Sequence, residues 1–445
     1  MQHDTFQPEL WKTLASDILR EAARLGASSA EVDIDYSKGF SVSSRLGEVE
    51  TVEYNQDKSV EITVYAGKRS GTVSLSDTRW EPIKTAIEAA WHIARFTEDD
   101  PYSGLADPKD LAFNYPQLEL DFPWALTVDE AIELACNCEK EGLAMDKRIV
   151  NSEGVTVLTS EDWHLYANSE KFLGFYPCTV HEISSILVAK EKDEMQRDYS
   201  YTTACDPSLL VPIKELAKQA VERTVGRLGA RRLETQKVPV IFLNEEARSL
   251  LGAFVAAMHG ENLYRKSSFL YDQLGKTVFP SFINIAEHPH LPKGLGSEPF
   301  DANGVLTRPN VFINQGVLQS YAMGVYSARQ LGLHTTGNAG GVHNLTISTG
   351  QRDLAGLLKL MNKGLLVTEL MGQGTNIVTG DYSRGACGYW VENGEIQYPV
   401  QEITIAGNLR EVFARIVEVG KDVDTRGNIR TGSILIEEMM IAGEG

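Results

Sequence analysis

The pattern of apolar and polar positions predicts a helix, several strands and a second helix in the first part of the chain. Residues 9–26 and 80–96 carry apolar side chains every three or four positions, as on one face of an amphipathic helix. Between these helices, apolar and polar residues alternate in short runs over residues 31–75, with tight turns such as Leu46-Gly47. Alternation interrupted by turns predicts an antiparallel meander.

The same order of elements returns after a long, proline-bearing polar loop at residues 98–124. Thr127 and Glu130 form a capping-box pair that predicts the start of a helix. Alternating runs then cover residues 149–190, and Asp206 followed by proline predicts the start of the closing helix. Two helix–meander–helix units favour a domain in which helices pack on antiparallel sheet.

The second half has short strands and glycine-rich hairpin turns, for example Asn314-Gln315-Gly316 and Asn393-Gly394. Helices are predicted from Asn244 and over residues 353–362 and 408–418. This pattern indicates a mainly-β, barrel- or sandwich-like domain with a few helices.

A chain of 445 residues is long enough for two or three domains. We predict an α+β fold, with an N-terminal α/β domain over residues 1–235 and the C-terminal mainly-β domain over residues 236–445. The formal charge is 42 − 61 = −19, which disfavours binding to nucleic acid or to an anionic membrane.

Five irregularly spaced cysteines are expected to be reduced, and the chain has neither a signal-peptide pattern nor an apolar run long enough to span a membrane. We therefore expect a cytoplasmic protein.

The stretch 254–266 (FVAAMHGENLYRK) combines an apolar helix with a polar end. His259, Glu261 and Arg265 gather where the apolar stripe stops, and His259 and Glu261 are candidate catalytic groups. Zinc hydrolases often carry two His one turn apart on such a helix, with a Glu beside the first. That pattern is missing, because Phe254-Val255-Ala256 stands where His and Glu would be expected. A structural lining role for the polar residues is the alternative.

Two glycine-rich segments could bind a ligand through backbone N–H groups. The first lies between His334 and His343, and the second leads into residues 381–387, where Arg384 could hold a carboxylate and Cys387 offers a thiol. A catalytic cysteine needs a base, and none can be paired with Cys387 from sequence.

His288-Pro289-His290 could ligate a metal, but no third ligand is identifiable, and an exposed loop is the alternative reading.

Eight longer motifs are distributed over the second half. They cover residues 263–269, 301–305, 326–329, 336–344, 369–374, 379–385, 392–399 and 403–408. Together they resemble the TldD/PmbA family, also described as modulators of DNA gyrase, and the PmbA (or TldE) branch in particular. The resemblance extends more weakly over the residues before about 235.

The resemblance implies the subunit without metal of a heterodimeric zinc metalloprotease. In the TldD branch, zinc is held by an H-E-x-x-x-H helix and a Cys near the C-terminus. Here Phe254, Val255 and Met258 replace the helix ligands, and residues 428–432 contain no Cys. A TldD-like partner would therefore supply the zinc, which activates water beside a Glu base.

This chain would complete the chamber and hold small unfolded peptides, such as antibiotic precursors and antitoxins. Extended peptides bind through backbone hydrogen bonds, so candidate peptide-binding residues come from the glycine-rich motifs and the end of the helix. They are Arg265, Gly340, Gly341, His343, Asn344, Gly374, Asp381 and Arg384.

Two alternatives remain. The chain could be an autonomous peptidase that uses His259, His288, His290 or Cys387, or a non-enzymatic regulatory homodimer linked to DNA gyrase or a toxin.

Overall fold

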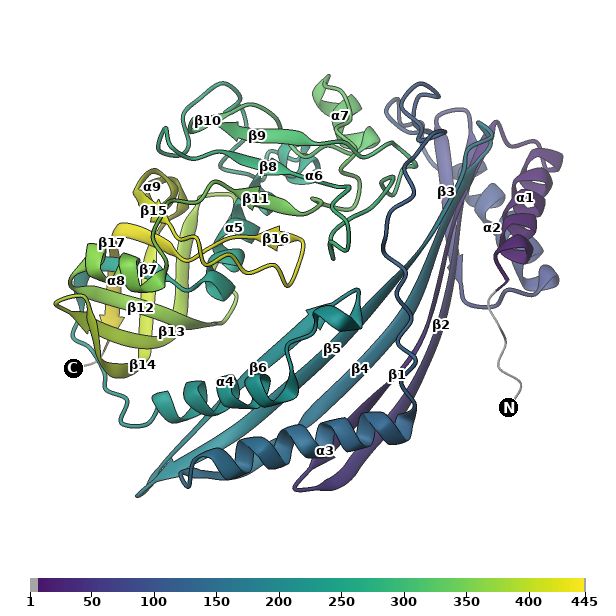
Figure 1. Ribbon diagram of the computed structural model, residues 1–445. Coiled ribbons are helices and arrows are strands. Elements are labelled where there is room, and N and C mark those ends of the chain that lie inside the picture. Colours follow the sequence, from purple (N-terminus) through teal and green to yellow (C-terminus); the bar gives the residue numbers. More distant parts are fainter. Residues whose placement is uncertain (1–6, 444–445) are drawn as a thin grey trace.

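A computed structural model describes residues 7–443, and in it both predicted meanders form one long, curved, antiparallel sheet (Figure 1). The strand order is β3-β2-β1-β4-β5-β6, so that the pairing of β1 with β4 joins the two units. The strands are β1 (Ser29–Arg45), β2 (Glu48–Ala66), β3 (Arg69–Leu75), β4 (Ile149–Asn168), β5 (Leu173–Glu191) and β6 (Glu194–Ala204).

Four helices cover the face of this sheet to which Val32, Ile34 and Val42 point. They are α1 (Pro8–Arg24), α2 (Trp80–Phe96), α3 (Val128–Met145) and α4 (Ile213–Gly226). Because side chains alternate along a strand, Asp33 and Asp35 lie on the opposite face. Within residues 7–443, no helix is both long enough and apolar enough to cross a membrane.

The strands are longer than the alternation predicted. Polar residues in the middle of β1 and β2 favoured two short runs each, whereas β1 and β2 pair without interruption from Ser29 and Tyr65 to Ser43 and Thr51. The ladder satisfies the backbone groups of the polar stretch, so the strands continue where apolar alternation stops. The closing strand β6 was not predicted.

Helix α4 begins later than predicted. The Asp206 carboxylate accepts a hydrogen bond from the Ser208 backbone N–H at 2.8 Å, but this caps only a single turn of 3₁₀-helix, η1 (Pro207–Leu209). Pro212 then disfavours helical conformation at the residue before it. The long helix therefore starts at Ile213.

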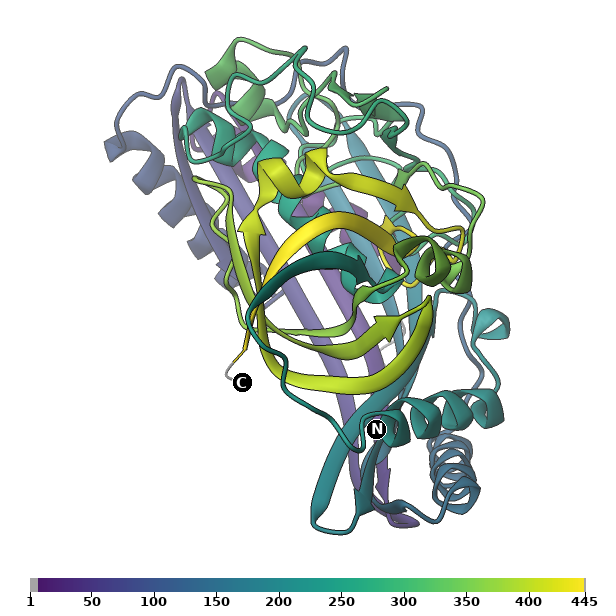
Figure 2. The same cartoon turned by 90° about the vertical axis from the view of Figure 1, so that its left-hand side faces the viewer.

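The C-terminal half contains a closed five-stranded barrel in the order β14-β13-β12-β7-β17, and pairing of β14 with β17 closes it (Figure 2). The barrel strands are β7 (Gln236–Phe242), β12 (Gly364–Met371), β13 (Asp381–Glu392), β14 (Glu395–Asn408) and β17 (Ile434–Gly443), with β15 (Ile416–Val419) beside β17. This confirms the predicted α+β class and its mainly-β second half.

A smaller sheet in the order β10-β9-β8-β11-β16 lies beside the barrel. Its strands are β8 (Ile285–Glu287), β9 (Asn310–Asn314), β10 (Val317–Leu318), β11 (Leu345–Ile347) and β16 (Ile429–Arg430). The helices of this half are α5 (Asn244–Met258), α6 (Gly260–Tyr264), α7 (Val325–Leu331), α8 (Leu354–Met361) and α9 (Leu409–Ala414).

Helix α5 is the apolar centre of the second half. Its buried side chains share one cluster with barrel residues such as Val240, Ile405 and Ile436, and with Ile285 of the small sheet. The alternate residues of the barrel strands, such as Ile241, instead pack against α8.

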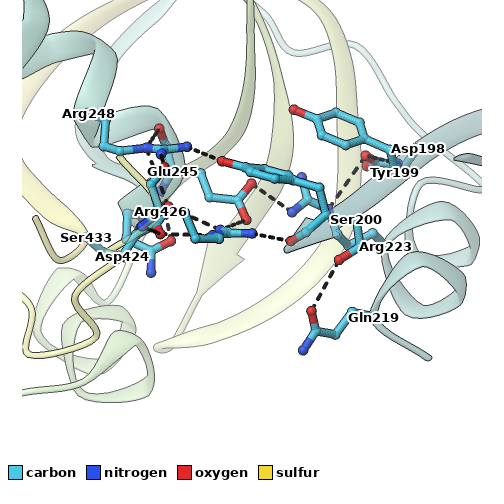
Figure 3. A network of polar contacts seen from close by, with 12 residues as sticks. Asp198, Tyr199, Ser200, Gln219, Arg223, Glu245, Arg248, Asp424, Arg426 and Ser433 are labelled. Atoms are coloured by element: carbon cyan, nitrogen blue, oxygen red, sulfur yellow. Dashed lines mark hydrogen bonds and ion pairs between the residues drawn. The ribbon is translucent and has the colours of Figure 1, made fainter. Parts of the chain in front are cut away.

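Ion pairs and hydrogen bonds across the two halves join α4 and β6 to α5 and to the segment before β16 (Figure 3). The Glu245 carboxylate on α5 lies 2.8 Å from Arg223 Nη1 on α4, and its other oxygen accepts a hydrogen bond from Arg426. Arg426 also pairs with Asp424 at 2.9 Å and donates to the Tyr201 carbonyl of β6 at 2.8 Å.

Charge is matched within this interdomain network. Its side chains are between 2 % and 23 % exposed, so an unpaired member would be costly. Three arginines and three carboxylates form its centre: Arg223, Arg248, Arg426, Asp198, Glu245 and Asp424. Arg227 extends it by pairing with Asp198 at 3.4 Å and with Glu369.

A second interdomain contact involves α7 and the loop after α2. Arg329 donates hydrogen bonds to the carbonyls of Gly104 at 2.9 Å and Leu105 at 2.6 Å. The Tyr326 hydroxyl donates to Asp100 at 2.8 Å. The two contacts together hold the C-terminal half at two separate places on the N-terminal half.

Replacing Glu245 with Gln removes the carboxylate that Arg223 and Arg426 share. We expect the free energy of unfolding at neutral pH to fall by about 3 kcal/mol. Burial opposes ionisation of Glu245, but the two arginines outweigh it and hold its pKa below the ordinary 4.5. The stability difference between wild type and E245Q should therefore be complete above about pH 6 and shrink as the pH falls below 4.5. Urea unfolding at a series of pH values measures both effects.

Glu222→Gln is the matched control, because the Glu222 side chain on α4 is 66 % exposed and lies 3.9 Å from Lys218. This change should alter stability by less than about 0.5 kcal/mol. An equal loss in both variants, or a difference that does not depend on pH, would contradict the role of the network.

Candidate functional site

The C-terminal part of helix α5 lies in apolar core. Phe254 is fully buried, and its ring centroid is 5.2 Å from that of Phe279 and 6.0 Å from that of Phe413. Met258 is also fully buried, and Val255 packs against the same cluster. Zinc prefers imidazole, thiolate and carboxylate ligands. The residues at the positions of a zinc-binding helix therefore do not fit a zinc ion.

The polar end of this helix lies at the surface. His259 separates α5 from α6 and is half-buried, and the backbone on either side of it pairs with Ala322. The side chains of Glu261 and Arg265 are exposed. The junction is thus held by its backbone. Of the polar residues that the sequence singled out, Glu261 and Arg265 are exposed and His259 is half-buried.

The glycine-rich loop over residues 335–344 is folded around the carboxylate of Glu287, which is fully buried. Each Glu287 oxygen accepts a hydrogen bond from Asn338 Nδ2 at 2.9 Å, and Oε2 accepts one from the His343 backbone N–H at 2.8 Å. Asn310 Nδ2 donates to Oε1 as well. Burial raises the pKa of Glu287 to about 7, although these donors favour its ionised form. The loop's N–H donors, which could have bound a ligand, therefore donate to Glu287 instead.

The candidate peptide-binding residues of this loop also have structural roles. His343 is 3 % exposed, burial lowers its pKa to about 4, and its Nε2 lies 3.1 Å from the Gly337 carbonyl. Asn344 Nδ2 donates to Ser297 Oγ at 2.8 Å. Gly340 and Gly341 have φ angles of 104° and 144°, a region that favours glycine. Of these four candidate residues, only Gly340 is exposed.

The second glycine-rich segment connects β12 to β13 at the barrel. A Cβ atom at Gly374 would lie 1.6 Å from the Ser383 carbonyl oxygen, so glycine is required by close approach of the two backbones. Asp381 is exposed, whereas Arg384 Nη1 donates to Ser249 Oγ on α5 at 2.8 Å. Arg384 therefore attaches the barrel to α5.

Burial raises the pKa of the Cys387 thiol, so little thiolate is present at neutral pH. Arg227 and Glu369, whose charges act on Cys387, are hydrogen-bonded to each other. His288 is exposed, while His290 Nε2 lies 2.9 Å from the Thr307 hydroxyl. The two imidazoles thus have different environments rather than a shared site.

A cavity of about 460 Å³ separates the N-terminal sheet from the C-terminal half. Residues in its wall include Asp35, His164, Tyr176, Cys178, Glu298 and Gly340.

Beside this cavity, Asp33, Asp35 and His164 place one potential metal-ligand atom each within 4.8 Å of one another. His164 Nδ1 lies 2.8 Å from Asp35 and 3.6 Å from Asp33. Burial opposes a charge on His164, but the two carboxylates raise its pKa. Burial in turn raises the pKa of Asp33 to about 7. The group is thus held together by the His164–Asp35 hydrogen bond.

Sequence reasoning missed Glu287, Asn338 and this Asp–Asp–His group. Asp33 and Asp35 are two residues apart on one strand, which is a visible signal that both lie on one face. Their partner His164 comes from β4, where it is directly opposite Asp35 in the ladder. No local pattern reveals a partner so distant in sequence.

Replacing Glu287 with Gln puts an amide donor where Asn338, Asn310 and the His343 backbone all donate. We expect one donor to lose its acceptor, which lowers the free energy of unfolding by about 2 kcal/mol. Chemical unfolding measures this loss, and Glu261→Gln at an exposed position is the control. A loss no larger than that of the control would contradict the organising role of Glu287.

Family models match three consecutive parts of the chain. Residues 30–94 match the PmbA/TldA metallopeptidase domain 1, residues 121–228 the central domain, and residues 235–443 the C-terminal domain. The chain is 48 % identical to Metalloprotease PmbA from Escherichia coli O157:H7 over 95 % of its length and 94 % of that protein. It is 44 % identical, over the same shares, to the Metalloprotease PmbA homolog from Haemophilus influenzae.

Two solved structures have the same fold. A candidate modulator of DNA gyrase from Bacteroides thetaiotaomicron superimposes with a TM-score of 0.91 at 26 % identity, covering 97 % of this chain and 99 % of that one. TldE from Thermococcus kodakarensis gives 0.81 at 20 % identity, covering 97 % and 100 %. The chain belongs to the PmbA/TldD family of metallopeptidases.

Proposed function

We propose that this chain is the subunit without metal of a cytoplasmic heterodimeric zinc metalloprotease, assembled with a TldD-like partner. The observation that carries this proposal is the packing of Phe254 and Met258 in the core of a metallopeptidase-family protein. Restoring ligands there would require polar groups inside a close-packed apolar cluster. The partner, not this chain, would hold the zinc.

The surroundings of the other reactive groups support the same proposal. Cys387 carries a thiol with a raised pKa, and His343 is buried and hydrogen-bonded to backbone. His259 and Glu261 lie at the surface end of α5. A catalytic group needs a general acid or base within hydrogen-bond reach, and the hydrogen bonds described for His343 and Cys387 provide no such partner.

The substrates we propose are small unfolded peptides, such as antibiotic precursors and antitoxins. The chain would complete the chamber around the partner's zinc and exclude folded proteins. Folded chains keep their backbone groups paired, whereas an extended peptide offers them to strand edges. The edge strands β6 and β16 border one hollow of this molecule.

Cleavage of an unstructured peptide by each subunit alone and by the two mixed tests this proposal. We expect cleavage only in the mixture, and zinc only with the TldD-type subunit when metal is measured before mixing. Stoichiometric zinc on this chain alone, or chelator-sensitive cleavage by it alone, would favour the autonomous peptidase instead.

Alanine variants at His259 and Cys387 sharpen this test. Removing a catalytic acid or base costs about 100-fold or more in rate. We expect the mixture to keep its cleavage rate with either variant, because neither side chain takes part in the reaction. A loss of that size would show that this chain supplies catalytic groups.

A further inference from the structure

A hollow of about 560 Å³ lies between the N-terminal sheet and the segment that leads into β16. It is separate from the cavity beside His164. Its wall includes Tyr201, Thr203, Asn244, Lys293, Thr425 and Arg430.

The charges in this wall are paired with one exception. Glu245 and Asp424 also line the hollow, and both are held by arginines of the interdomain network. Lys293 lies 2.6 Å from Asp206. The residue Arg430 is half-buried, and its guanidinium forms neither a hydrogen bond nor an ion pair with any other residue of the part of the chain that the structure describes.

An arginine that is partly withdrawn from water and has no protein counter-ion can accept an anionic ligand without breaking an existing ion pair. Burial lowers the pKa of Arg430, in keeping with a guanidinium that has lost water without gaining a counter-ion. A planar guanidinium matches a carboxylate through two parallel hydrogen bonds. The hollow thus offers a carboxylate a guanidinium that no other described side chain engages.

Two strand edges border the same hollow. β6 is the last strand of the N-terminal sheet, and β16 is the last strand of the small sheet. The Tyr201 carbonyl points outward from β6, since it accepts a hydrogen bond from Arg426. Thr203 is two residues further along an uninterrupted strand, so its backbone groups face the same edge. An extended chain could pair there.

We propose that this hollow binds a carboxylate of an extended peptide, with Arg430 as the partner of the carboxylate and the β6 edge as the partner of the peptide backbone. This inference rests on the proposed peptide-processing function and names one feature of its substrate. The carboxylate could be the C-terminus of the peptide or an Asp or Glu side chain.

Fluorescence anisotropy with the purified full chain tests the inference, using one labelled, unstructured, otherwise uncharged peptide in three forms. The forms are a free C-terminal carboxylate, a C-terminal amide, and the amide with one internal Glu. We expect at least one carboxylate form to bind about 10- to 100-fold more tightly than the plain amide, the range of a charged hydrogen bond. The form that binds identifies the source of the carboxylate.

Arg430→Gln should remove this preference, and Arg415→Gln should keep it. Arg415 is the matched control because its side chain is 40 % exposed and pairs at the surface with Glu411 and Glu438. Thermal unfolding checks that both variants are folded. Equal binding of all three peptides to the wild type, a preference that survives in R430Q, or no binding at all would overturn the inference.

The binding measurement uses this chain alone, so its failure differs from failure of the proposed function. If the carboxylate preference is missing but cleavage still needs both subunits, only the inference fails. If the preference is present but this chain cleaves without a partner, the proposed subunit role fails.

Discussion

The carboxylate of Glu245 is the centre of the ion-pair network that joins the two halves. It lies at the start of α5 and is shared by arginines from α4 and from the segment before β16. Removing such groups from water costs several kcal/mol per ion, and only close pairing offsets this cost. The network therefore favours one arrangement of the halves strongly over its neighbours. The cavity beside His164 and the hollow beside Arg430 both exist because that arrangement is held.

Helix α5 has two ends with opposite character. Its first turn carries Glu245 and Glu246, which suit the positive end of the helix dipole, and Glu245 joins the network. Its last turns bury Phe254 and Met258 among aromatic and aliphatic side chains. The helix thus connects the interdomain ion pairs at its first turn to the apolar core of the second half at its last turns.

The parts that the sequence predicted well are those with local causes. The capping box of α3 is present, since the Thr127 N–H donates to Glu130 and the Glu130 N–H donates to Thr127 Oγ1. Asn393-Gly394 forms the turn between β13 and β14. Element order and the α+β class follow from such signals because capping and turn geometry involve residues within a few positions of one another.

The site was less predictable from the sequence. A glycine-rich loop has the same composition whether its backbone N–H groups bind a ligand or bind other groups of the protein. Residues 336–344 contain the donors that a carboxylate or peptide would need, and Glu287 takes them. That carboxylate is about 50 residues away in sequence, and its burial is set by packing of β8 against β9 and β11. The Asp33–Asp35–His164 group likewise depends on the register of β1 against β4.

Periodicity and capping residues thus determine where helices and strands form, because both act over a few residues of chain. The sequence alone also shows that Phe254, Val255 and Ala256 are not zinc ligands, because their side chains are apolar. Tertiary structure alone decides which polar groups are satisfied and which remain available. Hydrogen-bond and charge partners are set by distance in space, and here they join residues that are scores to hundreds of positions apart. Arg430 differs from the arginines of the network in that, within residues 7–443, the fold brings no carboxylate into an ion pair with it.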